Sequence, residues 1–581
     1  MLIFKALACD YDGTLASEDR LGPEALVALR KAREAGLRLV LVTGRTFFEL
    51  TRVCEHLDLF DGVVAENGGV LYFPSTAMIR TLAPPPPARL LAELDRRGVA
   101  YQLGHVVVGT ARGEETAVRA ALAEAGANLE LVYNRAALMA LPAGIAKGGG
   151  VGHVLRAFGL SYHDVLALGD AENDLDLFAA CGWAGCPASA VPELQRDADW
   201  IFPGEDGAAV AHAIVGPILN DLLPLDRSAR QRIDLGWAAE TAEPESIPAR
   251  GVNVLIQGDP ISGKSWLAGA LVERLHERRY AVCVIDPEGD YCGLTRLAGV
   301  IVTEIHDQAD VDSALRYFER DPAACVVIDL STVANAEKVR MIERCLLAIR
   351  EIRRQRGFPH WVVLDEVHYS LHREGVAEWA LAAEDKGLCL VTYKSSWVRP
   401  SVMSAIDVLI FARTTAAHEV ALLRSFLAES GSSSGGVISA LATLPPGKFV
   451  VMRKEGSGAW AALTFTAAPR ATPHVRHLRK YADASVRPGY AFLFRAPDGC
   501  LVATADSLNG FRRIVATTDE GVLAYHAGRH DFSRWIRGVF ADPELAAQLR
   551  KAERRWRRGE VADLRGLIDE LIAVRYWSEE L

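Results

Sequence analysis

The sequence lacks any apolar run long enough to cross a bilayer, which takes about 18 consecutive residues or more. Its mostly apolar N-terminal stretch, Met1–Cys9, ends at once in Asp10 and Asp12, unlike the apolar core of a secretion signal. We therefore expect a cytoplasmic protein with no membrane partner.

Cysteines paired at the short spacing of a metal site are also missing. The ten cysteines are scattered, without the repeated short spacing of a zinc site, so we interpret them as reduced core thiols. Basic residues are not in excess either, because 64 lysines and arginines stand against 74 acidic residues, for a net charge of −10. This balance argues against a protein that coats nucleic acid over its whole surface, but it permits a local basic site.

A length of 581 residues exceeds what one hydrophobic core holds, about 250–300 residues, so several domains are expected. Short apolar stretches alternate with amphipathic helical ones, which predicts an α/β multidomain fold. We expect a Rossmann-like core with a small α/β cap, a second α/β domain in which the segment Gly258–Ser265 is typical of a P-loop NTPase, and a small, mainly helical C-terminal domain. The predicted boundaries are 1–80 and 144–215 for the core, 81–143 for the cap, and 216–250 for a connector with room for one helix. The second α/β domain is expected at 251–469 and contains a flexible stretch at 430–436. A basic linker at 470–488 and the C-terminal domain at 489–581 follow.

The core opens with two carboxylates at the end of an apolar strand. The stretch Phe4–Cys9 predicts a buried strand, and Asp10-Tyr11-Asp12-Gly13-Thr14 follows it at the edge where open α/β sheets bind ligands. One carboxylate can attack phosphorus while another, two residues later, protonates the leaving oxygen. Asp10 is therefore a candidate nucleophile and Asp12 a candidate general acid and base.

Three further motifs follow in the order that a phosphatase requires. Thr43 ends a strand and offers a hydroxyl to a phosphate, and Lys147 offers a cation to the charge that develops in the transition state. The segment Gly169–Asp174 follows the strand Val165–Leu168 and supplies oxygen ligands for Mg²⁺. For Asn173 and Asp174, an alternative role is the N-terminal cap of a helix.

Together with the turn Glu66-Asn67-Gly68-Gly69, these motifs resemble the haloacid dehalogenase (HAD) superfamily. The similar branch contains Cof-type, phosphoglycolate and sucrose-phosphate phosphatases, whose cap lies between the threonine and lysine motifs. The resemblance covers about residues 1–215 and implies an aspartyl-phosphate at Asp10, with Thr43 and Lys147 as further catalytic residues. The Mg²⁺ ligands that it implies are Asp10, Asp12 through its carbonyl, Asp170, Asn173 and Asp174.

The cap is expected to select the substrate. Its short length favours a small phosphorylated metabolite, while a nucleic-acid end entering an open cleft remains an alternative. Its candidate polar contacts, which the sequence does not rank, are Tyr101, Gln102, His105 and Arg112.

A second constellation begins at Gly258. The segment Gly258-Asp259-Pro260-Ile261-Ser262-Gly263-Lys264-Ser265 follows a predicted strand, Val252–Gln257, and opens a predicted helix, the context that a Walker A phosphate loop requires. We predict that the glycines and the start of the helix bind the phosphates of ATP. Lys264 would reach the β and γ oxygens, and Ser265 would hold Mg²⁺.

A predicted strand, Trp361–Leu364, delivers Asp365 and Glu366. The first carboxylate would lie near Mg²⁺, and the second would polarise the attacking water, which favours hydrolysis over simple nucleotide binding. This set is similar to the HerA/FtsK group of ATPases, which implies a homo-oligomer, a hexamer. Thr392-Tyr393 departs from the Thr-Gln pair of that group, and this puts movement of DNA in doubt.

The C-terminal domain carries little chemistry. A basic stretch, Arg550–Arg558, fits a solvated helix face better than a nucleic-acid site, and His526 with His530 lacks a third metal ligand.

From the two constellations we predict a Mg²⁺-dependent phosphomonoester hydrolase fused to an ATP-binding and ATP-hydrolysing domain. One alternative is a nucleic-acid end-processing enzyme of the polynucleotide kinase/phosphatase type. Another is a DNA-associated hexameric ATPase with a phosphatase effector.

Overall fold

The computed structural model of the protein describes residues 2–17, 19–225, 228, 230–260, 262–367, 370, 386–429, 440–454, 460–473, 482, 486, 489–540 and 542–577. These residues form two compact units, 1–285 with 294–472, and 286–293 with 473–581. Among the helices of the described residues, none has both the length and the apolar character needed to span a membrane. The expected flexible stretch 430–436 and most of the expected basic linker, 474–480 included, lie outside the described residues.

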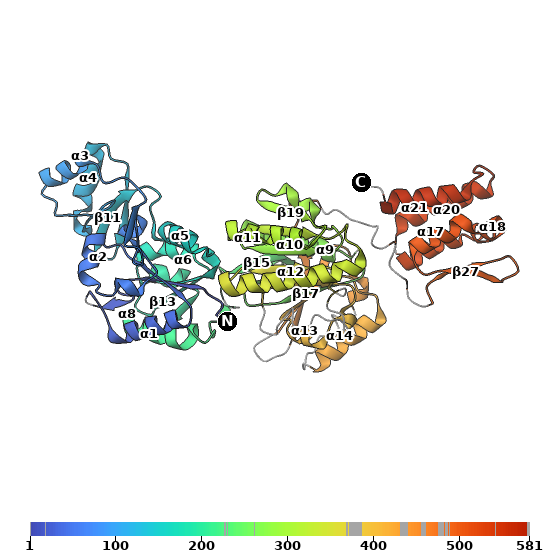
Figure 1. The fold of residues 1–581 in the computed structure, drawn as a ribbon, viewed down its shortest axis with the longest axis horizontal. Coiled ribbons are helices and arrows are strands. Elements are labelled where there is room, and N and C mark those ends of the chain that lie inside the picture. Colours follow the sequence, from blue (N-terminus) through green and yellow to red (C-terminus); the bar gives the residue numbers. More distant parts are fainter. Residues whose placement is uncertain are drawn as a thin grey trace. The chain divides into compact units, whose positions relative to one another are not determined.

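An eight-stranded sheet forms the N-terminal core (Figure 1). Its inner strands are buried along their whole length because helices cover both faces, as in parallel sheets generally. The sheet order is β14 (Trp200–Phe202), β13 (Trp183–Pro187), β12 (Val165–Leu168), β1 (Ala6–Asp10), β4 (Arg38–Val42), β5 (Gly62–Ala65), β6 (Val70–Phe73) and β7 (Met78–Thr81). A small hairpin follows β1, formed by β2 (Ala16–Ser17) and β3 (Arg20–Leu21). The core helices are α1 (Pro23–Glu34), α2 (Phe47–Val53), α5 (Lys147–Phe158), α6 (Leu175–Ala180), α7 (Pro192–Asp197) and α8 (Asp206–Ala213).

The segment between β7 and α5 folds into a separate small layer. Its antiparallel sheet has the order β10 (Leu129–Asn134), β11 (Ala137–Pro142), β9 (Val108–Ala111) and β8 (Gln102–Leu103). Two helices, α3 (Ala88–Arg96) and α4 (Glu115–Ala125), lie side by side against it (Figure 1). Leu90, Leu94 and Leu122 of these helices are buried with residues of β9 and β11, so this layer has its own hydrophobic core.

An eleven-stranded sheet organises the next part of the chain. The neighbouring strands β23, β17, β22, β21 and β18 are parallel to one another. On the other side of β23, strands β24, β25 and β15 continue the sheet, each antiparallel to its neighbour. The order is β16 (Pro244–Pro248), β15 (Arg232–Ala238), β25 (Trp460–Ala467), β24 (Lys448–Lys454), β23 (Val408–Phe411), β17 (Val254–Gln257), β22 (Leu388–Thr392), β21 (Trp361–Leu364), β18 (Val282–Asp286), β20 (Cys325–Asp329) and β19 (Val300–Glu304). The helices are α9 (Lys264–Glu277), α10 (Gln308–Leu315), α11 (Tyr317–Arg320), α12 (Asn335–Arg356), α13 (Pro400–Ser404) and α14 (Ala417–Glu429).

The structure differs from the expected connector at residues 216–250. This stretch contains β15 and β16, which pair with each other and extend the eleven-stranded sheet through β25. In β15, Ile233 and Leu235 are buried, while Trp237 is exposed. A bulge between Asp234 and Gly236 interrupts the alternation, and this obscures the period of two that reveals a strand in a sequence.

The C-terminal residues form a hairpin followed by helices, as the sequence predicts. Strands β26 (Phe492–Arg495) and β27 (Leu501–Ala505) are antiparallel. The helices are α17 (Leu508–Thr517), α18 (Glu520–Gly528), α19 (Asp531–Trp535), α20 (Pro543–Arg557) and α21 (Leu564–Trp577). With two α/β sheets, an inserted small layer and a mainly helical end, the predicted fold class is confirmed.

Candidate active site

The two N-terminal carboxylates lie at the carboxyl edge of the core sheet. Strand β1 ends at Asp10 between β4 and β12, which are both parallel to it. Neighbouring parallel strands deliver their loops to the same edge, so Thr43 after β4 and Asp170 after β12 follow the strands on either side of Asp10. The left-handed Gly13 (φ +73°) turns the chain beside Asp170, where an added Cβ would lie 2.5 Å from Oδ2.

Lys147 links two buried carboxylates at the centre of the site. Its Nζ donates to Asp10 Oδ1 at 2.5 Å and to Asp174 Oδ1 at 2.7 Å. Burial disfavours the charge of the ammonium, but the two carboxylates outweigh that effect and hold the pKa of Lys147 above its usual value. The lysine is therefore charged and fixed in place at the start of α5.

Asp170 and Asp174 belong to one hydrogen-bonded loop. Oδ2 of Asp174 accepts from the amides of Asp170 and Ala171 at 3.0 and 3.1 Å, so the helix-cap role foreseen for Asp174 is present beside its contact with Lys147. The hydroxyl of Thr14 donates to Asp170 Oδ1 at 3.0 Å. Ligand oxygens of Asp10, Asp170 and Asp174 lie within 4.8 Å of one another.

Negative charge is in excess at this point of the molecule. Burial raises the pKa of Asp10 well above its usual value, Asp174 and Asp170 add to that rise, and Lys147 opposes it. The pKa of Asp170 is raised by burial and by Asp174. Buried carboxyl groups with raised pKa values, as at Asp10 and Asp170, fit a divalent cation, which would stabilise their charged forms.

Asp12 is more accessible than Asp10, since 35% of its side chain is exposed. The guanidinium of Arg45 contacts both of its oxygens, with Nη2 to Oδ1 at 2.6 Å and Nε to Oδ2 at 2.8 Å. Arg45 also pairs with Asp19 of the β2–β3 turn. These contacts hold the Asp12 carboxylate against Arg45 at a partly exposed position.

Asn173 and Thr43 complete the constellation. Asn173 Nδ2 donates to Asn67 Oδ1 at 3.2 Å, while its own Oδ1 is buried and has no hydrogen-bond partner among the described residues. The Thr43 hydroxyl is buried and accepts from the amide of Arg45 at 3.1 Å. The structure thus brings together all the residues of the first predicted site, and adds Arg45 and Asn67 to them.

The cap candidates separate into different places. Arg112 Nη1 lies 3.7 Å from Glu172 Oε1 in the loop of Asp170, so it is at the site. His105 instead contacts Glu66, Tyr101 packs in the core of the small layer, and Gln102 is exposed. Arg135, which belongs to none of the sequence motifs, lies at the tip of the β10–β11 hairpin and pairs with Asp170. The feature of the sequence that could have indicated Arg135 is a short turn between two apolar strands.

The second constellation is built on three neighbouring strands, β17, β22 and β21. The phosphate loop follows β17, turns at the left-handed Gly263 (φ +98°), and leads into α9, which begins at Lys264. Lys264 Nζ donates across the loop to the carbonyl of Asp259 at 2.9 Å. Ser265 lies in the first turn of α9, beside the unsatisfied amides that a helix offers to phosphate.

The paired carboxylates follow β21, two strands away from β17. Asp365 and Glu366 are both buried, and the amide of Glu366 donates to Asp365 Oδ1 at 2.8 Å. Glu366 has a left-handed backbone (φ +48°), which is uncommon for a residue with a side chain. Thr392 ends β22 between these two strands, so the three motifs lie along one carboxyl edge.

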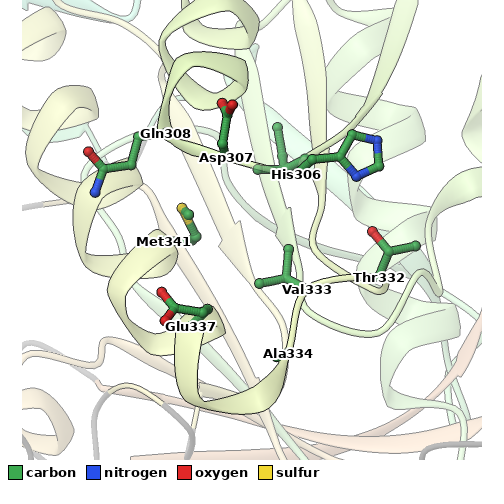
Figure 2. A pocket seen from close by; sticks show the side chains of 9 residues that line it. His306, Asp307, Gln308, Thr332, Val333, Ala334, Glu337 and Met341 are labelled. Carbon is green, nitrogen blue, oxygen red and sulfur yellow. The ribbon is translucent and has the colours of Figure 1, made fainter.

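A cavity of about 370 Å³ opens at another part of the same sheet (Figure 2). His306 and Asp307 follow β19, Thr332 lies between β20 and α12, and Glu337 lies in the first turn of α12. In the sheet order, β20 is four strand spacings from β17, or roughly 19 Å at the usual separation. This cavity is therefore separate from the phosphate loop.

The histidines of the C-terminal helices have other partners than a metal. His526 Nδ1 lies 2.9 Å from Asp531 Oδ2, and its Nε2 accepts from the amide of Arg495 at 2.9 Å. His530 Nδ1 lies 3.0 Å from Glu553 Oε2. These contacts hold the hairpin and the helices together, which gives both histidines a structural role.

Two family models match the chain. The first describes a haloacid dehalogenase-like hydrolase and matches residues 7–105 and 102–214. The second describes the central domain of the helicase HerA and matches residues 262–346. The first spans the N-terminal constellation, whereas the second includes Lys264 and Ser265 and ends before Asp365 and Glu366. Together they confirm the predicted combination of a HAD unit with a HerA-like unit.

Curated relatives match the first of these regions. A phosphoglycolate phosphatase of Methanothermobacter thermautotrophicus is 33% identical over 227 residues, which are 36% of this chain and 97% of that protein. One of Haloarcula marismortui is 31% identical over 219 residues, with 36% and 95% covered. A solved structure from Thermoplasma acidophilum has 20% identity, covers 37% of this chain and 99% of that one, and has a TM-score of 0.33. The chain therefore belongs, through its N-terminal region, to the haloacid dehalogenase-like hydrolase family and is a phosphatase of that family.

Proposed function

We propose that the N-terminal region is a Mg²⁺-dependent phosphomonoester hydrolase that works through an aspartyl-phosphate on Asp10. The observation that carries this proposal is the cluster of Asp10, Asp170 and Asp174, whose oxygens lie within 4.8 Å of one another. Lys147 lies 2.5 Å from the Asp10 oxygen. A nucleophilic carboxylate, a cation and a set of hard oxygen ligands thereby meet at one point.

The residues present fit Mg²⁺. Three buried carboxylates stand against the ammonium of Lys147 and the half-exposed guanidinium of Arg135, and Asn173 adds a buried carbonyl oxygen that lacks a partner among the described residues. Asp10, the carbonyl of Asp12 and Asp170 would hold the ion, with Asn173 and Asp174 in support. When bound, the ion would neutralise the phosphoryl oxygens and favour ionised Asp10.

The chain's own residues account for the first chemical step. A carboxylate oxygen of Asp10 attacks phosphorus, the ester bond between phosphorus and the alcohol oxygen breaks, and Asp12 gives its proton to that oxygen. Lys147 and the hydroxyl of Thr43 stabilise negative charge on the phosphoryl group. Because Arg45 donates to both Asp12 oxygens in the structure, Asp12 leaves this ion pair to carry its proton to the leaving oxygen.

The second step regenerates the enzyme. Asp12, now ionised, takes a proton from water, and the resulting hydroxide attacks the phosphorus of the aspartyl-phosphate. The bond between phosphorus and Asp10 breaks, which releases inorganic phosphate and returns Asp10 to its carboxylate form. Asp12 is protonated again and ready for the next ester.

A small phosphorylated metabolite is the favoured substrate class. The two relatives described above are named phosphoglycolate phosphatases, and in this chain a compact cap of four strands and two helices contacts the loop of Asp170. We therefore propose phosphoglycolate as the first compound to test. Ends of nucleic acids remain the alternative substrate.

The test is phosphate release with and without Mg²⁺ from phosphoglycolate, sugar phosphates, nucleotides and 3′- or 5′-phosphorylated oligonucleotides. We expect release from a small ester, loss of release in Asp10→Asn, and retention in Lys264→Ala, whose change lies in the other constellation. Rapid acid quenching with a ³²P-labelled substrate should trap labelled wild-type protein and no labelled Asp10→Asn. Full activity of Asp10→Asn would refute the proposal.

We propose, as a second function, that the HerA-like region binds and hydrolyses ATP and assembles into a hexamer. The observation that favours it is the meeting of Lys264, Asp365 and Glu366 along one carboxyl edge of the sheet. In this proposal Gly258, Gly263 and Lys264 bind the phosphates, Ser265 and Asp365 serve Mg²⁺, and Glu366 orients water.

Two variants separate ATP binding from hydrolysis. Glu366→Gln should retain ATP binding and lose hydrolysis, while Lys264→Ala should lose both; Lys448→Ala, at an exposed position of β24, is the matched control. Light scattering with and without ATP and DNA measures assembly. A monomer under all conditions would contradict the hexamer, and ATP turnover by Lys264→Ala equal to wild type would contradict the assigned site.

A further inference from the structure

The tip of the β10–β11 hairpin has an unusual backbone. Asn134 pairs with Ala137, so only Arg135 and Ala136 form the turn, and Arg135 adopts a left-handed conformation (φ +50°). Turns of this kind favour glycine, asparagine or aspartate, because a longer side chain costs about 1 kcal/mol or more there. An arginine at this position indicates that its side chain serves a purpose other than forming the turn.

The hairpin tip is held by one contact to the core and by one contact within the cap. The amide of Arg135 donates to Glu172 Oε2 at 3.0 Å, and Glu172 lies in the same loop as Asp170. Arg112 Nη1 donates to the carbonyl of Arg135 at 3.2 Å, while its guanidinium lies over the ring of Tyr133 at 4.7 Å. The backbone of the tip is therefore positioned independently of the Arg135 side chain.

The side chain of Arg135 reaches from the cap to the phosphoryl site. Its Nη2 pairs with Asp170 Oδ2, and about half of the side chain remains exposed. The oxygens of Asp170 and Asp10 lie within 4.8 Å, so a group in contact with Asp170 is within reach of a short leaving group on phosphorus at Asp10. The Arg112 side chain is also half-exposed, and its guanidinium contacts the backbone carbonyl of Arg135.

We propose that Arg135, with Arg112 beside it, binds an anionic group on the alcohol side of the substrate. This inference rests on the proposed phosphatase function and specifies its substrate class, which is a small phosphomonoester whose alcohol carries a carboxylate or a second phosphate close to the ester. A guanidinium presents two parallel donors that match a carboxylate, and its exposed half leaves donors for one. Arg135 is in this sense a specificity-determining residue.

The experiment compares two esters of similar size, phosphoglycolate and ethyl phosphate, which differ in the carboxylate. In Arg135→Gln, the ratio of kcat/KM for phosphoglycolate to kcat/KM for ethyl phosphate should fall on the order of 30-fold, because any change at Asp170 affects both esters alike. Arg135→Lys should recover part of the preference. The control is Arg96→Gln, at an exposed position of α3 in the same cap, which should change neither value.

A binding measurement separates this inference from the proposed function. Calorimetry with 3-phosphonopropionate, which carries the carboxylate, and propylphosphonate, which lacks it, tests the same difference without turnover. Arg135→Gln should weaken the binding of 3-phosphonopropionate alone, by about tenfold or more. An equal loss with both ligands, or no loss with either, would overturn the role of Arg135. If the wild type binds both phosphonates but releases phosphate from neither ester, the proposed function fails, and the binding ratio still decides the inference.

Discussion

Lys147 carries a positive charge at a position with no exposed side-chain surface. We predict that Lys147→Met, besides losing activity, lowers the free energy of unfolding by about 3–5 kcal/mol, because Asp10 and Asp174 are left as buried carboxylates without a counter-charge. Urea unfolding in the presence of EDTA measures this change. Lys31→Met, on the exposed face of α1, controls for the loss of a lysine, and an equal stability of both variants would contradict the prediction.

The acidic cluster should also report Mg²⁺ directly. We predict that Mg²⁺ raises the thermal unfolding midpoint of the wild type, because an ion bound only by the folded state stabilises that state. Asp170→Asn should lose most of this rise, while Asp95→Asn, at an exposed position of α3, should keep it. A full rise in Asp170→Asn, measured by differential scanning calorimetry, would remove Asp170 from the set of ligands.

At the scale of elements, Glu66 fastens the cap to the core. Its fully buried carboxylate accepts from the amides of Phe47, His105, Val106 and Val107 at 2.8–3.3 Å. We predict that Glu66→Gln weakens this attachment, because a charge-assisted acceptor of several amides becomes a neutral one with a misplaced donor, at a cost of about 1–3 kcal/mol.

Hydrogen exchange is the measurement for this attachment. In Glu66→Gln the amides of residues 105–107 should exchange faster, while those of β1 in the centre of the core sheet keep their wild-type rates. The matched control is Glu49→Gln, in the first turn of α2, because it leaves the Glu66 carboxylate and its hydrogen bonds unchanged. Unchanged exchange at 105–107 would show that other contacts hold the cap.

The elements that could be predicted from sequence are those with strong local signals. The strands ending at Asp10, at Gln257 and before Asp365 are short, continuous apolar stretches that deliver motif residues, so both sheets and most residues of both sites follow from them. The positions that could not be predicted depend on contacts distant in sequence. Arg135 is a site residue only because its hairpin docks on the loop of Glu172, and no local pattern encodes that docking.

At the scale of the whole molecule, a group of buried polar residues connects the two α/β sheets of the first compact unit. Asp164, just before β12, accepts from Arg250 at 2.9 Å and lies 3.3 Å from Nε2 of His360, just before β21. His163 stacks on Tyr280 with ring centroids 3.6 Å apart. These strands lead to Asp170 and Asp365, so the junction fixes the amino-terminal ends of two strands that carry the proposed sites.

The junction should make the first unit sensitive to acid. Burial and the neighbouring His360 lower the pKa of His163 to about 3, whereas an unfolded histidine titrates near about 6.5. Because the unfolded chain binds the proton more tightly, the stabilisation is complete above the unfolded pKa and is lost as the pH falls from about 6.5 towards 3, by at most about 1.4 kcal/mol per pH unit. The prediction is that His163→Phe, which keeps a ring on Tyr280, flattens the dependence of the unfolding free energy on pH by up to one proton. His306→Phe, at an exposed position, should keep the wild-type slope, and an unchanged slope in His163→Phe would mean that other groups set the acid sensitivity of the unit.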